Sequence, residues 1–144
     1  MFLLVLLASF LIAPATCMKM LGAPDTIINP DNDNSTVEIV NHVLDDENAQ
    51  RYLNKTSPLV LVQVLEATRQ VVAGHRYRVT FAAGEARCPS QKGRKYKVRR
   101  EKCWLFRNGE MRIYKIDVVD APWEKPPKQI LEKQVVYSFY YNSK

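Results

Sequence analysis

The strongest constraint on the fold is a change of hydrophobic period near Pro58. Before this residue apolar side chains recur at helical spacing, and after it the chain holds Leu and Val runs and alternating segments typical of strands. A single helix followed only by strands predicts an α+β domain, an antiparallel sheet with one face covered by the helix. The residues at helical spacing are Val37, Val40, Val43 and Leu44.

The helix is expected over residues 36–53. Ser35 followed by Glu38 fits a capping box, in which the two side chains satisfy main-chain N–H groups at the start of a helix. Pro58 helps to end the helix because the residue before a proline disfavours helical angles. Residues 18–34 have no periodicity and are rich in Gly, Pro, Asp and Asn, so they predict an extended arm.

Two strands are expected directly after the helix. Leu59–Leu65 form an apolar run, and Arg76–Phe81 alternate between apolar and polar residues. The chain must reverse between them, which places a hairpin at Gln70–Gly74. The alternation sends Tyr77, Val79 and Phe81 to one face of the sheet and Arg76, Arg78 and Thr80 to the other.

Two further strands complete the expected sheet. The third begins near Cys103, passes a turn or bulge at Asn108–Gly109 and continues through Arg112–Val119. The segment Ala121–Trp123 ends it, and Pro126–Pro127 prevents an early return to strand. The last strand is indicated by the alternation of Val135, Tyr137, Phe139 and Tyr141.

The N-terminus predicts export. Residues 2–12 are almost entirely apolar and small residues follow them, so residues 1–17 are expected to be a signal peptide and residues 18–144 the single mature domain. The apolar run is too short to span a bilayer, which needs roughly 20 residues. Sequons at Asn34 and Asn54 are candidate glycosylation sites. We therefore expect a secreted, extracellular protein with no membrane span.

Cysteine usage agrees with export. Cleavage after Cys17 would leave an even pair, and an oxidising compartment would then let Cys88 bond Cys103. The chain-entropy model assigns so short a loop about 3 kcal/mol of stabilisation. Cleavage after Ala15 would instead retain Cys17 as an odd thiol.

Three short segments resemble motifs of the cystatin family. Gln70, Val71, Val72, Ala73 and Gly74 match its Q-x-V-x-G hairpin motif. Pro122 and Trp123 match its second hairpin motif, and Met20, Leu21 and Gly22 resemble its N-terminal segment that ends in a glycine. The three occur in the family's order, and the resemblance covers roughly residues 20–141.

The resemblance implies a twisted antiparallel sheet wrapped around one α-helix. It also implies a wedge at one edge of the sheet, built from the N-terminal arm and two hairpin loops. In the family this wedge enters the active-site cleft of papain-like, cathepsin-type cysteine proteases and excludes substrate, reversibly and without a covalent bond. The implied partner is therefore such a protease, and the implied protein is an inhibitor.

The first hairpin motif suits the role that the resemblance implies. An enzyme cleft is concave and mostly apolar, and Val71, Val72 and Ala73 would present small apolar surface to it. Gly74 permits a close main-chain approach that a side chain would prevent. Gln70 is expected to anchor the loop by hydrogen bonding.

The other two segments suit it as well. Trp123 offers a large rigid surface of the kind enriched at binding hot spots. Pro122 stiffens its loop and so lowers the ordering cost of binding. In the arm, Leu21 is expected to fill an apolar subsite and Gly22 to let the chain bend. An ordinary hairpin and a buried Trp123 are the alternatives to this interpretation.

The chain departs from the longer secreted members of the family, which carry two disulfides. Its cysteines suffice only for the first, and Tyr114 falls roughly where a cysteine of the second would lie. The link from Trp123 to Gln134 is also longer and more polar than expected.

The loop between Cys88 and Cys103 is strongly basic, in a chain with a formal net charge of +6. It is either a solvated loop or a patch for polyanions such as heparin-like glycans or anionic lipid. Weak polyanion binding by a non-inhibitory protein of this fold is therefore the alternative function. Tyr96 is the loop's single aromatic residue, so no nucleic-acid partner is expected. The cations are Lys92, Arg94, Lys95, Lys97, Arg99, Arg100 and Lys102.

No enzyme is expected. His42 falls in the helix and His75 just after the first hairpin, and neither pairs with a Cys or Ser in a catalytic pattern. Two histidines and two bonded cysteines make no metal site. We expect a monomer without catalytic residues, metal or cofactor. Trp104, next to Cys103, is assigned to packing.

Overall fold

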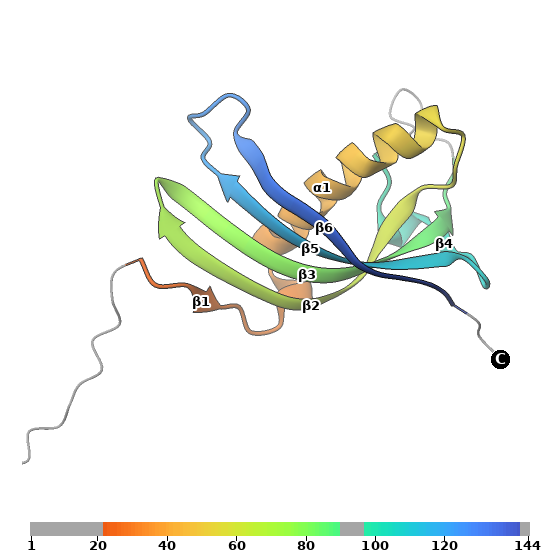
Figure 1. Ribbon diagram of the computed structural model, residues 1–144, viewed down its shortest axis with the longest axis horizontal. Coiled ribbons are helices and arrows are strands. Elements are labelled where there is room, and N and C mark those ends of the chain that lie inside the picture. Colours follow the sequence, from red (N-terminus) through yellow and green to blue (C-terminus); the bar gives the residue numbers. More distant parts are fainter. Residues whose placement is uncertain (1–21, 90–96, 142–144) are drawn as a thin grey trace, which may run out of the picture.

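The computed structural model describes residues 22–89 and 97–141. It contains one long helix, two single-turn 3-10 helices and six strands (Figure 1). In chain order the elements are β1 (Asp25–Thr26), η1 (Pro30–Asn32), α1 (Asn34–Leu53), β2 (Leu59–Val72), β3 (Gly74–Arg87), η2 (Arg100–Lys102), β4 (Trp104–Leu105), β5 (Glu110–Asp120) and β6 (Lys128–Tyr140).

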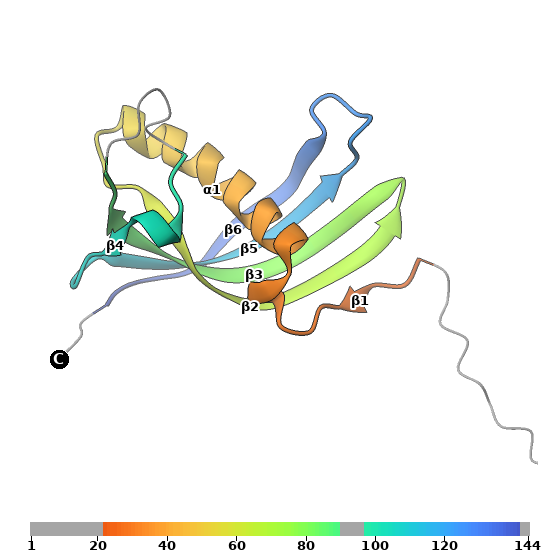
Figure 2. The same ribbon diagram turned by 180° about the vertical axis from the view of Figure 1, so that it is seen from behind.

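The strands form one curved antiparallel sheet that wraps around α1, and the two opposite views show the helix lying in its hollow (Figures 1 and 2). The strand order is β1-β2-β3-β5-β6, and β4 pairs with the end of β3. The predicted α+β class is confirmed. The prediction of four strands is wrong, because two-residue strands such as β1 and β4 are too short to give a sequence period.

The core lies between α1 and the hollow face of the sheet. Ile39, Val40, Val43 and Leu44 from the helix pack against the buried side chains of β2, β3 and β5. Phe81 stacks on Tyr114 with ring centroids 5.3 Å apart. Tyr114 is 1% exposed, so a core aromatic side chain occupies the position where a cysteine of a second disulfide would lie.

The helix begins two residues earlier than predicted. Asp33 caps it by accepting hydrogen bonds from the main-chain N–H of Thr36 at 2.8 Å and from its hydroxyl at 2.6 Å. These bonds hold the pKa of the Asp33 carboxyl below its usual value. The predicted capping box at Ser35 and Glu38 is therefore wrong, because Asp33 is the N-cap and Ser35 already lies in the first turn.

A buried amide fixes the connection from α1 to β2. Asn48, 1% exposed, donates to the carbonyl of Leu59 at 2.8 Å and accepts from its N–H at 2.7 Å. Both main-chain groups at the start of β2 are thereby satisfied inside the core, where an unpaired group would cost roughly 1–3 kcal/mol. This pairing sets where the sheet begins relative to the helix.

The faces of β3 are as predicted: Tyr77, Val79 and Phe81 are buried against the helix. The last strand differs from its prediction, since β6 begins at Lys128 and not near Val135. Val136 is an extra residue in a β-bulge, because Val135 pairs with Tyr114 and Tyr137 with the preceding residue Ile113. The predicted alternation of Val135 and Tyr137 on one face is therefore broken.

Candidate functional site

The first hairpin motif lies where β2 turns into β3. Val72 pairs with Gly74, which leaves Ala73 alone at the tip. Val71 is 65% exposed and Val72 40% exposed, so neither valine serves the core. The hairpin therefore ends in a narrow apolar tip, as the sequence predicts.

Gly74 joins the two hairpins. Its φ of +103° lies in the left-handed region that glycine adopts without strain. A Cβ at this position would collide with the main-chain oxygen of Asp120 and would lie 3.1 Å from the Cβ of Ala121. The close approach that glycine permits is thus to the end of β5 in the same molecule, which adds a second role to the one predicted.

Gln70 joins the arm to the first hairpin. Its side-chain amide donates to the carbonyl of Gly22 at 2.6 Å, across 48 residues of sequence. Gln70 was expected to anchor the loop by hydrogen bonding, and the bond that it makes ties this loop to the arm. Gly22 has a φ of +88°, which turns the chain at this contact. Leu21 lies outside the described residues, so its predicted role stays a prediction.

The second hairpin links β5 to β6. Its loop is closed by hydrogen bonds from Ala121 N to Pro127 O at 2.8 Å and from Glu124 N to Ala121 O at 2.9 Å. The Lys125–Pro126 peptide bond is cis. Trp123 is 65% exposed in this loop, so the alternative of a core tryptophan is wrong.

These three segments lie at one end of the sheet. The β2–β3 hairpin, the β5–β6 loop and the start of β1 all lie on the left side of the sheet in Figure 1. The contacts of Gln70 with Gly22 and of Gly74 with Ala121 tie the three together. We call this end the wedge, defined by Gly22, Gln70–Gly74 and Pro122–Trp123.

Charged pairs support the strands behind the wedge. Asp117 accepts two hydrogen bonds from Arg76, at 2.7 and 2.9 Å, and one from Arg78 at 3.3 Å. These guanidinium groups, Arg76 first, hold the pKa of Asp117 below its usual value. Lys128, at the start of β6, forms an ion pair with Glu38 of α1 at 2.9 Å, and this pairing raises the pKa of Lys128.

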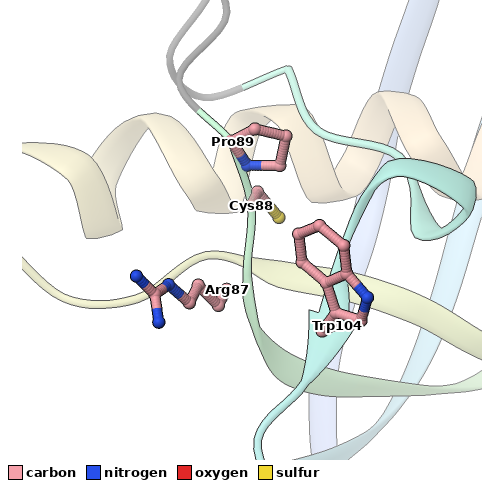
Figure 3. A pocket seen from close by; sticks show the side chains of 4 residues that line it. All are labelled: Arg87, Cys88, Pro89 and Trp104. Atoms are coloured by element: carbon pink, nitrogen blue, oxygen red, sulfur yellow. The ribbon is translucent and has the colours of Figure 1, made fainter.

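The opposite end of the molecule carries the disulfide. Cys88 is bonded to Cys103, as predicted. An open pocket beside this bond is lined by Arg87, Cys88, Pro89 and Trp104 (Figure 3). Trp104 is 69% exposed, so its assignment to packing is wrong. The two-residue strand β4 pairs with the end of β3 and leaves the indole at the surface.

The basic loop is only partly within the described residues, since Lys92, Arg94 and Lys95 lie outside them. Arg99 forms a double hydrogen bond with the Asp45 carboxylate of α1, at 2.7 and 3.0 Å. Arg100 donates to the carbonyl of Cys103 at 3.1 Å. At least two of the seven cations thus serve the fold itself, which weakens the interpretation of the loop as a polyanion patch.

Over residues 22–89 and 97–141, no group of three His, Cys, Asp or Glu side chains is arranged to hold a metal ion. Within the same ranges no helix has both the length and the hydropathy to cross a bilayer. The exposed apolar tips of the wedge, with Val71 and Trp123 each 65% exposed, are the strongest candidate for a binding surface.

Comparison with protein families agrees with this geometry. The family model of the cystatin domain matches residues 25–108, more than half of the chain. The chain belongs to the cystatin family. Cystatins are generally inhibitors of cysteine proteases and not enzymes. The match spans the first hairpin of the wedge, and Trp123 lies beyond it.

Individual cystatins are similar to this chain in sequence or in fold. Cystatin cpi-1 of Caenorhabditis elegans is 31% identical over 81 residues, which are 56% of this chain and 58% of that protein. The crystal structure of dimeric human cystatin F superposes with a TM-score of 0.59 at 15% identity, over 92% of this chain and 98% of that one. The salivary cystatin of the soft tick Ornithodoros moubata gives 0.58 at 16% identity, over 81% and 98%.

Proposed function

We propose that this cystatin is a reversible, non-covalent inhibitor of papain-like cysteine proteases and that its wedge enters their active-site cleft. The observation that carries the proposal is the hydrogen bond from Gln70 to Gly22, which holds the arm against a hairpin whose apolar tip is exposed. A preformed wedge loses little conformational entropy on binding, so more of its contact energy appears as affinity.

The proposed mechanism is steric. Val71 and Val72 would press into the apolar cleft from one side and Trp123 from the other, with the protease's reactive cysteine between them. Side chains that are already exposed need no rearrangement to make these contacts. The arm at Gly22 would lie along the substrate-binding side of the cleft, where Leu21 would fill an apolar subsite.

We also propose that residues 18–144 are the exported form and that Asn34 and Asn54 accept glycans. Asn34 is the first residue of α1 and Asn54 its C-cap, and both are exposed. The cystatin family includes secreted members, and the Cys88–Cys103 bond is compatible with an oxidising compartment.

The experiment is a titration of the oxidised protein against papain with a fluorogenic peptide substrate, at low and high salt. Apolar wedge binding predicts tight, reversible inhibition that persists in high salt. Absence of inhibition by the folded protein would overturn the proposal. Binding to heparin that disappears with added salt, without inhibition, would favour the basic-loop alternative.

A further inference from the structure

The outer edge of β6 is open. β6 is the last strand of the sheet, and its outer edge pairs with no strand among the described residues. Every residue from Leu131 to Tyr141 is exposed, on both faces of the strand. A strand edge of this kind presents unpaired N–H and C=O groups and is a template for pairing with another strand. Its large apolar residues are Leu131, Val135, Val136, Tyr137, Phe139, Tyr140 and Tyr141.

The regular part of this edge is its C-terminal end. Extra residues at Leu131 and Val136 interrupt the register with β5, whereas residues 137–140 pair with residues 113–110 without a break. Bulges hinder pairing with a further strand, so the stretch beyond Val136 is the one suited to it. Residues 134–141 contain no charged side chain that would oppose association.

The hydrogen-bond pattern shows which groups point outward. The N–H of Tyr141 donates to Gly109 O in the chain before β5. In an antiparallel ladder alternate residues point to opposite sides, so Phe139 and Tyr137 also bond toward β5. The main-chain groups of Ser138 and Tyr140 therefore point away from the sheet.

We propose that two copies of this chain pair antiparallel along residues 137–140 of β6 and the following Tyr141, about a two-fold axis that passes beside Phe139. This register places Ser138 opposite Tyr140 of the second copy, and the outward N–H and C=O groups of the two residues form four hydrogen bonds. Phe139 then faces Phe139 of the second copy in a close, non-hydrogen-bonded pair, and Tyr137 faces Tyr141 of the second copy. Each directly opposed pair on that face is aromatic, a combination that stabilises sheets.

The exposed apolar area matches what such a dimer needs. The four aromatic side chains of this segment are 44 to 75% exposed. At roughly 200 Å² per aromatic side chain they offer about 500 Å² per copy, or about 1,000 Å² in total. That area is at the lower limit for a specific interface. We therefore expect a dissociation constant in the micromolar range.

The arrangement has a consequence that rests on the proposed function. The paired segment lies at the end of β6 away from the wedge, on the right side of the sheet in Figure 1. Antiparallel pairing there would join two sheets into one and leave the two wedges at opposite ends. The dimer would be a bivalent inhibitor able to hold two proteases at once.

The first test is sedimentation of the intact, oxidised protein over concentrations up to about 200 µM, well above the expected constant. We expect a monomer–dimer equilibrium that Tyr137→Lys weakens at least tenfold, because the ammonium would be placed in the aromatic interface. Trp104→Lys is the control, since Trp104 is 69% and Tyr137 67% exposed. A monomer at every concentration overturns the proposal. So does a dimer that Tyr137→Lys leaves unchanged, which is the result expected if two copies instead exchange their β2–β3 hairpins.

The second test fixes the register. Phe139→Cys should form a disulfide-linked dimer under mild oxidation, because opposed Cβ atoms in such a pair lie about 4.5–5.5 Å apart. Tyr137→Cys, on the same face, should not form one, because position 137 faces position 141 of the second copy and lies four residues away from position 137 of that copy. Equal cross-linking of the two variants, or none above the unmodified protein, overturns the register. Neither test measures inhibition, so this proposal and the proposed function can fail independently.

Discussion

The side-chain nitrogen of Gln70 lies 2.6 Å from the main-chain oxygen of Gly22, a contact between parts of the chain 48 residues apart. It extends the link that the pairing of β1 with β2 makes between the N-terminal arm and the first hairpin. Without it the chain ahead of β1 would have to be ordered at the moment of protease binding, at a cost in conformational entropy.

Gln70→Ala should therefore weaken inhibition of papain roughly two- to tenfold, the value of one hydrogen bond. The free energy of unfolding should change little, because the contact lies at the end of the sheet. Gln63→Ala, on an exposed position of the same strand, is the control. In a protein truncated through Gly22, Gln70→Ala should have no further effect on the inhibition constant. A full effect in the truncated protein would show that Gln70 does not act through the arm.

Gly74→Ala should lower the free energy of unfolding by about 2 kcal/mol or more. An alanine at a φ of +103° is strained, and its Cβ would meet the main-chain oxygen of Asp120. Urea unfolding measures the effect. Gly22→Ala is the matched comparison. Gly22 has a similar φ of +88°, but a Cβ added there would lie 3.7 Å from its nearest neighbour, Val71 O. Equal costs for the two substitutions would contradict the contact between the hairpins.

Stability should fall in acid. The pKa of Asp117 is lowered by Arg76 and then Arg78, and that of Glu110 first by Arg112. A carboxylate with a lowered folded-state pKa stabilises the protein fully above its unfolded pKa, and this contribution is lost as the pH falls through the folded value. The free energy of unfolding should therefore decrease below about pH 5, starting from the unfolded values near 4.

Asp117→Asn isolates the contribution of one carboxylate to this pH dependence. It should lower stability at pH 7 and flatten the decrease in acid, as measured by urea unfolding at pH 7 and pH 3. Glu66→Gln, at an exposed position of β2, should preserve the slope. A slope that Asp117→Asn does not change would rule out this carboxylate as a source of acid sensitivity.

Removal of the Cys88–Cys103 disulfide by alanine at both positions should cost about 3 kcal/mol of stability, because the bond closes a short loop in the unfolded chain. Inhibition of papain should stay within about twofold, since this bond lies at the end opposite the wedge. A large loss of inhibition in the folded variant would mean that the disulfide end also contacts the protease.

Part of the sheet follows from sequence because β3 alternates regularly. Arg76 to Phe81 place every second side chain in the core, and the turn at Gln70–Gly74 carries the glycine that its backbone requires. The last strand was less predictable. Its apolar and aromatic residues do alternate along the sequence. The bulge at Val136 nevertheless places Val135 on the face opposite Tyr137, and a bulge has no sequence period that would predict it.

The helix start and Trp104 show where local rules compete. Asp33 and Ser35 are both residue types that cap helices, and Asp33 is the cap because its carboxylate accepts from the Thr36 N–H, which places Ser35 inside the first turn. Trp104 is exposed because it pairs with the exposed Arg87, whereas the next residue, Leu105, packs against the core cluster beside the disulfide. The sequence does not show that Gln70 bonds Gly22, since the two residues are distant along the chain. A glutamine in an otherwise apolar motif is the one sign that this side chain has a polar partner.

The most direct test of the wedge compares the two exposed tryptophans. Trp123 is 65% exposed at the wedge and Trp104 is 69% exposed at the opposite end, so neither substitution to alanine should unfold the protein. We predict that Trp123→Ala raises the inhibition constant for papain at least thirtyfold, the roughly 2 kcal/mol typical of a hot spot, and that Trp104→Ala leaves it unchanged. Equal effects, or a loss confined to Trp104→Ala, would contradict the assignment of the protease-binding surface to the wedge.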